Sequence, residues 1–170
     1  MSTQTQPAPD FSPAQTVVEK TRAPALLLPI FKLPLVLYRL HLGWLLGHRF
    51  MQLTHVGRRS GKLRRTVLAV LQFDAQTREI KAVSAWNASE WYKNIQASPA
   101  QQVETGFTRY APEQRDLTAE ELAQLFVDFC QQHPLFSRMV CRIPNWKWDS
   151  SYEEFLELAR TLHGVAFRPK

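Results

Sequence analysis

Hydrophobic and polar residues alternate through the middle of the chain. The segment RFMQLTHV (49–56) alternates polar and apolar residues, and RRTVLAVLQF (64–73), which passes from polar to mainly apolar residues, is read as the next strand; both are rich in strand formers. A period of two is typical of a β-strand with one buried face. REIKAVSAW (78–86) follows the turn DAQT (74–77) and has the same character. The short connections predict an antiparallel meander of three strands.

The pattern then changes to a helical period. A first helix is predicted over 87–99, where Asn87 and Glu90 have capping-box spacing and Pro99 ends the helix. Two further helices are predicted over 119–133 and 152–163. Each follows the same kind of spacing, Thr118 with Glu121 and Ser151 with Glu154, and Gly164 is the predicted cap at the end of the last helix.

The remaining segments complete the predicted fold. Two strands are predicted around Gly106 within 101–117, a short helix over 135–143, and a last strand over 165–169. This order lacks the strand–helix alternation of a parallel sheet. It predicts an α+β fold with a mainly β core, in which helices pack around a small antiparallel barrel.

An apolar segment precedes the predicted barrel. Residues 24–48 are almost long enough to cross a bilayer, but prolines and charged residues interrupt them, which argues against a membrane span. Two interpretations stay open, and both can hold at once: a broken helix packed on the domain core, or a segment lying on a membrane surface. In the second, the side chains at the lipid headgroups are Lys32, Tyr38, Arg39 and Trp44.

The length of 170 residues suits one globular domain, which we place at 49–170, after the apolar segment 24–48 and a flexible polar tail at 1–23. The tail has no features of a secretory signal. The two cysteines and five histidines do not cluster, so no metal site is predicted. The expected location is the cytoplasm, with peripheral contact to the inner face of the membrane as an open alternative.

Positive charge is concentrated in one turn. The net charge is +6, and five of the 21 lysines and arginines lie within the eight residues 58–65. Such clustering favours a local site for an anion over a general basic surface. The cations do not form a stripe interleaved with aromatic residues, so nucleic-acid binding is not expected.

The composition of this turn suits an anion. Gly57 and Gly61 permit a left-handed backbone and close approach of backbone N–H groups, and Ser60 adds a hydroxyl. Guanidinium groups match phosphate or carboxylate oxygens in pairs. The turn lacks the GxxxxGK[ST] order of a P-loop. From these residues alone, an anion cradle and a solvated basic hairpin are both open interpretations.

Two motifs, separated along the chain but in the expected order, resemble those of a known family. LTHVGRRSGKLRRTVL and, further on, AVSAWNASEWYKNIQASPAQQV are similar to the signature of the deazaflavin-dependent nitroreductase and quinone reductase family. The resemblance covers Phe50 to Val103. It implies a six-stranded split β-barrel that binds coenzyme F420 and transfers a hydride to a quinone, a nitro compound or another electron-poor planar acceptor. This cofactor carries a phosphodiester and a polyglutamate tail.

The resemblance also implies roles for individual positions. One group holds the phosphate and glutamates, a second begins the strand beside the cofactor, a third lies by the deazaflavin ring, and a fourth closes the pocket. These are, in turn, Arg58, Arg59, Ser60, Gly61 and Arg64; Arg65, Thr66, Val67 and Leu68; Ser84, Ala85 and Trp86; and Trp91, Tyr92 and Asn94. Leu63 and Val67 stand where the best-known members have prolines, and Trp86 stands where a small residue is common.

The sequence does not single out a catalytic residue. The candidates for a proton donor are Tyr92, Tyr110, His133 and water, with Tyr92 as the side-chain candidate within the predicted site. Two other functions stay open: a split barrel that binds FMN or haem, and a non-enzymatic protein that binds lipids or fatty acids. The sequence is compatible with a monomer or a homodimer.

Overall fold

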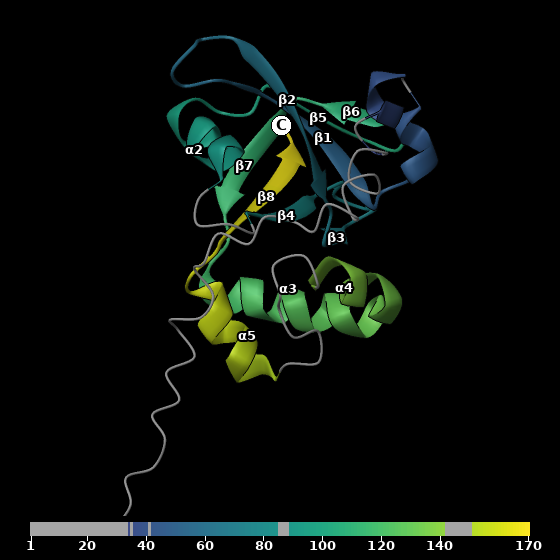
Figure 1. Cartoon of the computed structure of the whole chain (residues 1–170), viewed down its shortest axis with the longest axis vertical. Helices are drawn as coiled ribbons and strands as arrows, with labels where there is room; N and C mark the ends of the chain where they lie inside the picture. The colour runs from purple at the N-terminus through teal and green to yellow at the C-terminus, as the bar shows by residue number, and fades with distance from the viewer. Residues whose placement is uncertain (1–33, 35, 41, 85–88, 142–150) are drawn as a thin grey trace, which may run out of the picture.

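The protein contains two antiparallel four-stranded sheets, with helices at the side and below (Figure 1). The computed structural model describes residues 34, 36–40, 42–84, 89–141 and 151–170. In the first sheet the strand order is β2-β1-β5-β6, and in the second it is β3-β4-β8-β7. The strands are β1 (Phe50–Val56), β2 (Leu63–Ala69), β3 (Gln72–Phe73), β4 (Ile80–Ser84), β5 (Gln102–Thr105), β6 (Thr108–Tyr110), β7 (Pro112–Asp116) and β8 (His163–Pro169).

The chain passes directly from one sheet to the other at two places. Between β2 and β3, the N–H of Val70 donates to the carbonyl of Arg49 at 2.9 Å, and the next N–H, of Leu71, donates to the carbonyl of Lys81 at 2.9 Å. Arg49 directly precedes β1 of the first sheet, whereas Lys81 lies in β4 of the second. Ala111 is the only residue between β6 and β7, at the second crossing. The prediction of six strands was therefore wrong in count, because the segments 64–73 and 101–117 each contain a bend that divides a strand between the sheets.

The helices follow the predictions except at their ends. Both later capping boxes are confirmed, at Thr118 and Ser151. The capping box predicted at Asn87 and Glu90 was wrong, since α2 begins after Ser89, whose side chain makes no capping hydrogen bond. Gly164 does not cap a helix but lies within β8. The helices are η3 (a 3-10 helix, Gly43–Leu46), α2 (Glu90–Ala97), α3 (Ala119–Gln132), α4 (Pro134–Cys141) and α5 (Tyr152–Ala159).

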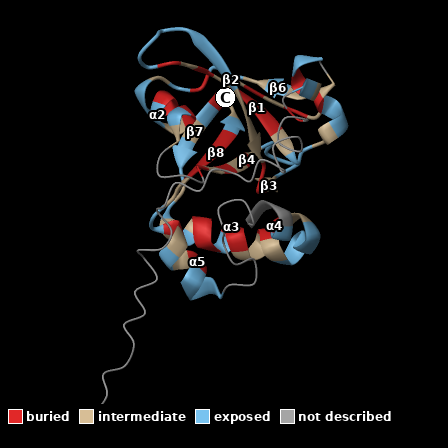
Figure 2. Cartoon of the chain, in the orientation of Figure 1, coloured by how far each residue is buried: buried red, intermediate tan, exposed pale blue. Residues whose placement is uncertain are grey.

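Two hydrophobic clusters hold the fold together, as the buried residues in Figure 2 show. The first fills the space between the sheets and is completed by two side chains from α2, Trp91 and Ile95. The second joins α3 to α5, where Phe126 and Phe155 stack with ring centroids 5.5 Å apart. Because α2 contributes to the first cluster, its position relative to the β1–β2 turn is fixed by core packing.

Part of the apolar segment packs against the first sheet. Tyr38 is buried, and its hydroxyl donates to the carbonyls of Phe50 at 2.9 Å and Glu104 at 3.3 Å. The placement of Tyr38 at lipid headgroups was therefore wrong. Residues 1–33, including the predicted tail and Lys32, lie outside the described residues. In the described part of the chain, no helix combines the length and the apolar character that crossing a bilayer requires.

Candidate functional site: an arginine-lined cavity

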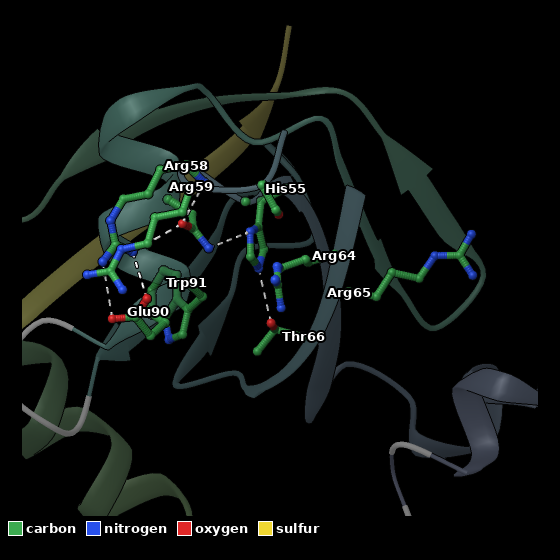
Figure 3. A pocket seen from close by; sticks show the side chains of 11 residues that line it. His55, Arg58, Arg59, Arg64, Arg65, Thr66, Glu90 and Trp91 are labelled. Carbon is green, nitrogen blue, oxygen red and sulfur yellow. Dashed lines mark hydrogen bonds and ion pairs between the residues drawn. The ribbon is translucent and has the colours of Figure 1, made fainter. Parts of the chain in front are cut away.

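The basic turn and α2 enclose a cavity of about 360 Å³ (Figure 3). The turn comes from the end of β1 and the start of β2, which pair in register from Phe50 opposite Ala69 to Val56 opposite Leu63. Four arginines and one carboxylate line the cavity. The lining residues are His55, Gly57, Arg58, Arg59, Ser60, Arg64, Arg65, Thr66, Glu90, Trp91 and Asn94.

Hydrogen bonds inside the turn use most of its backbone donors. The N–H groups of Ser60 and Gly61 donate to the carbonyl of Gly57, at 3.0 and 2.8 Å, and the N–H of Gly57 donates to Lys62 at 2.9 Å. The N–H of Arg58 donates to the Asn94 side chain. The prediction that backbone N–H groups form the cradle was therefore wrong for these positions, and an incoming anion meets mainly side chains.

The two turn glycines serve different purposes. Gly61 has a φ of +64°, a left-handed conformation in which glycine is favoured. At Gly57, an added Cβ would lie 2.7 Å from Nε of Arg64 and 2.8 Å from Oγ of Ser60. A methyl group there would displace two of the side chains that line the cavity, so Gly57 provides space for them.

Arg58 is already engaged by the protein. Its guanidinium donates to both carboxylate oxygens of Glu90, at 2.7 and 3.3 Å, and to Oδ1 of Asn94 at 3.2 Å. The hydrogen bond from Arg58 lowers the pKa of Glu90, which stays ionised. No ion pair with a described residue occupies Arg59, Arg64 or Arg65. Figure 3 shows that Arg65 extends away from the other arginines.

A buried hydrogen-bond network lies beneath these arginines. Oδ1 of Asn94 faces two donors on Arg58, so its Nδ2 faces Nδ1 of His55, 3.3 Å away. Nδ1 must therefore accept, and Nε2 carries the proton and donates to Oγ1 of Thr66 at 3.1 Å. Burial and, to a lesser degree, the nearby Arg64 lower the pKa of His55, which favours a neutral imidazole ring. The hydroxyl hydrogen of Thr66 is left to bind an acceptor in the cavity.

The structure brings together most, but not all, of the predicted site residues. Eight line the cavity: Arg58, Arg59, Ser60, Arg64, Arg65, Thr66, Trp91 and Asn94. Five others do not: Gly61, Val67, Leu68, Ser84 and Tyr92. Ala85 and Trp86 lie outside the described residues.

The residues that do not line the cavity have other contacts. Ser84 is fully buried, and its hydroxyl lies 2.7 Å from that of Ser89, which ties the end of β4 to the start of α2. Tyr92 stacks on His163 with ring centroids 4.4 Å apart.

Sequence reasoning missed His55 and Glu90. His55 carries a readable signal, since it continues the inward alternation of Met51 and Leu53 along β1, and all three are buried. A polar residue at an inward position indicates an internal hydrogen-bond partner. Glu90 has no such signal, because its contact with Arg58 joins positions 32 residues apart.

The pattern of the F420H(2)-dependent quinone reductase family matches residues 36–142, which is more than half of the chain. The chain belongs to this family. It is therefore an oxidoreductase, and its cofactor is coenzyme F420. No curated protein matches the chain.

Several solved structures are similar to this quinone reductase family member. An F420-H2 dependent reductase (FDR-A) is 17% identical, with a TM-score of 0.46, over 72% of this chain and 96% of that one. An FMN-binding protein related to pyridoxamine 5'-phosphate oxidase, from Nostoc punctiforme, is 15% identical, with a TM-score of 0.41, over 86% and 81%. The haem storage protein HutZ from Vibrio cholerae is 9% identical, with a TM-score of 0.43, over 75% and 85%.

The cavity of this family member fits the anionic part of F420. Among the described residues that line it, the guanidinium groups without an ion pair and the Thr66 hydroxyl are donors, and Glu90 is the only carboxylate, already paired with Arg58. Phosphate and carboxylate oxygens are acceptors that arginine binds in pairs. A volume of about 360 Å³ is at the small end of ligand sites, which suits the phosphate and the first glutamates rather than the whole cofactor.

Proposed function

We propose that this enzyme transfers a hydride from reduced F420 to a quinone, a nitro compound or another electron-poor planar acceptor, and that the arginine-lined cavity holds the cofactor's phosphate and glutamates. The supporting observation is the division among its arginines. Arg58 is fixed by Glu90 and Asn94, whereas Arg59, which lies near enough to Glu90 to help lower its pKa, and Arg64 line the same cavity without an ion pair to a carboxylate of the described chain.

Each group at the cavity has a distinct task in this proposal. Arg59 and Arg64 bind the anionic oxygens, Arg65 binds the outer part of the tail, and the Thr66 hydroxyl donates one further hydrogen bond. Arg58 is a positioning residue that fixes the turn against α2. When bound, reduced F420 supplies the hydride, and the protein contributes orientation and a dry environment.

The ring-side assignments remain proposals. Val67 and Leu68 continue along β2 from Thr66, and Ser84 ends β4 beside the start of α2. We place the deazaflavin ring along these residues together with Ala85, Trp86 and Tyr92.

Among the candidate proton donors, Tyr110 is the least suitable. Its hydroxyl donates to the carbonyls of Arg78 and Phe167, at 2.9 and 3.2 Å, and burial raises its pKa to about 12. Tyr92 remains the side-chain candidate in the predicted site. His133 lines a different cavity.

We also propose that the two sheets are the halves of a split barrel forming the cofactor-binding domain, residues 49–170. Treating each bent pair, β2 with β3 and β6 with β7, as one strand gives six strands that follow one another around a ring. The protein works as a monomer or a homodimer in this proposal, without nucleic acid.

Titration with purified F420 of defined tail length tests the cavity assignment. Charge-assisted hydrogen bonds contribute about 1.5–3 kcal/mol each, so Arg59→Ala and Arg64→Ala should each weaken binding roughly 10- to 100-fold. The loss should be larger for longer tails and smaller at high salt. Arg160→Ala is the matched control, because Arg160 is exposed at the end of α5, pairs with Glu157 and does not line the cavity. Equal affinities for all three variants would refute the assignment.

Turnover assays test the reaction itself. Oxidation of reduced F420 should be accelerated by menadione, a nitroaromatic compound, or both, and the ratio of rates identifies the acceptor class. A purified preparation with the absorption spectrum of bound flavin or haem, and no response to F420, would contradict the proposal.

Peripheral membrane contact is the finer proposal for location. Val36, Leu40, Trp44, Leu45 and Phe107 are all exposed, and the rings of Trp44 and Phe107 stack with centroids 5.5 Å apart. We name these five residues the apolar patch. Tryptophan is enriched at the membrane interface, because its ring is mostly apolar but carries a polar N–H group that can lie at the lipid headgroups. The patch lies partly within the segment 24–48, whose residue Tyr38 anchors it to the first sheet.

Sedimentation with anionic phospholipid vesicles tests this contact. A smaller fraction of the double variant Trp44→Ser and Phe107→Ser should sediment with the vesicles than of the wild type. Leu135→Ser, which replaces another exposed apolar residue, on α4, should sediment as the wild type does. Failure of the wild-type protein to sediment with vesicles would exclude the contact and leave the cofactor assignment unaffected.

A further inference from the structure

A second cavity, of about 280 Å³, lies where the chain bends from β2 into β3 and faces the helical layer. Val70 and Leu71 of the bend form part of its wall, and α3 and α4 supply the opposite side. It shares no lining residue with the arginine-lined cavity. Nothing in the proposed cofactor site uses it.

Two aromatic walls face this second cavity. On one side His48 stacks on Phe73, with ring centroids 3.7 Å apart and planes within 7°. On the other side Phe129 contacts His133 and Phe136 edge to face, with centroids 5.7 and 5.8 Å apart. A flat stacked pair opposite aromatic edges is an arrangement that accommodates a planar ring.

The His48 ring is held in place from a second direction. Gly106 has a φ of +52°, and a Cβ at this position would lie 3.0 Å from Cε1 of His48. Burial lowers the pKa of His48, which favours the neutral form of its ring.

The polar part of the cavity favours an acidic substituent. No Asp or Glu lines it, whereas Arg49 and His133 do, together with Gln72 and Gln132. No ion pair or side-chain hydrogen bond engages the guanidinium of Arg49 within the described chain. An unpaired arginine beside aromatic walls matches a ring that carries an anionic oxygen.

We propose that this second cavity is a binding site for a flat aromatic anion of one or two fused rings, such as an aromatic carboxylate or phenolate. Its volume lies just below the usual range of small-molecule sites, about 300–1,000 Å³, which limits the ligand to a compact ring system. Because this cavity shares no lining residue with the proposed cofactor site, the ligand is an effector and not the hydride acceptor.

Calorimetric titration of the full-length protein with 2-naphthoate tests the site, with the uncharged 2-naphthamide as the ligand control. The carboxylate should bind more tightly than the amide, and Arg49→Gln should weaken carboxylate binding at least tenfold while leaving amide binding unchanged. Gln132→Trp places a large side chain at the cavity and should weaken both. Arg160→Gln is the matched surface control and should change neither.

Unfolding temperatures of the variants establish that they fold. The proposal is overturned if wild-type protein shows no binding at millimolar 2-naphthoate, or if folded Arg49→Gln and Gln132→Trp bind it as the wild type does. F420 affinity is measured in parallel and should be the same in Arg49→Gln, so failure of this site and failure of the cofactor site are distinguishable.

Discussion

Replacing Asn94 with leucine should destabilise the protein although it preserves the approximate volume of the side chain. The substitution removes the acceptor for the backbone N–H and guanidinium of Arg58, at 3.0 and 3.2 Å, and the donor to Nδ1 of His55. Asn94 and His55 are 5% and 2% exposed, so water cannot easily replace these bonds. The Arg58 guanidinium keeps its bonds to Glu90.

The magnitude follows from the groups left without partners. A buried donor or acceptor that loses its partner costs about 1–3 kcal/mol, and here there are two, the N–H of Arg58 and Nδ1 of His55. We therefore expect the free energy of unfolding to fall by about 2–6 kcal/mol, a large part of the 5–15 kcal/mol typical of a domain. Gln96→Leu on the same helix is the control, because Gln96 is exposed and its loss should cost less than about 0.5 kcal/mol.

Urea unfolding followed by tryptophan fluorescence measures both variants. A double-mutant cycle with His55→Phe then isolates the contact, and a coupling energy of about 0.5–3 kcal/mol is expected for residues in one network. A loss below about 0.5 kcal/mol for Asn94→Leu, or a coupling of zero, would refute the reasoning, since it would mean that the network is not buried in solution.

Three further predictions concern the same region and one helix end. Because the pKa of His55 is lowered on folding, its contribution to stability is full above the unfolded pKa of about 6.5 and decreases as pH falls toward the folded pKa; His55→Phe should reduce this slope in unfolding measured between pH 7 and 5. Gly57→Ala should displace Arg64 and Ser60. The free energy of F420 binding, measured by titration, should therefore fall by more than the free energy of unfolding. Thr118→Ala removes a capping bond and should cost about 0.5–2 kcal/mol in urea unfolding without changing F420 affinity.

The sequence predicted the elements well where the signal is local. Strand alternation, the basic turn and the capping boxes at Thr118 and Ser151 depend on residues a few positions apart, and the structure agrees. The bend at Val70 and Leu71 was not predicted, because the apolar run VLAVLQF is the same whether a strand continues or divides between two sheets.

The site shows the same distinction. The charge of the turn was evident, but the pairing of Arg58 with Glu90 depends on how α2 packs over the turn. A count of arginines therefore overstates the free positive charge at the cavity. The role of His55 was readable only from its inward position between Leu53 and the end of the strand.

The two crossings between sheets have a consequence for folding. The chain passes from one sheet to the other at Val70–Leu71 and at Ala111, so two strands of each sheet continue almost directly into strands of the other. β8 lies between β4 and β7, although α3, α4 and α5 separate it from β7 in the sequence. Such non-local pairing is typical of slow folding in a single cooperative step. The amides of Val70 and Leu71 should consequently exchange with solvent at one common rate, set by opening of the whole domain, although their hydrogen bonds lie in different sheets.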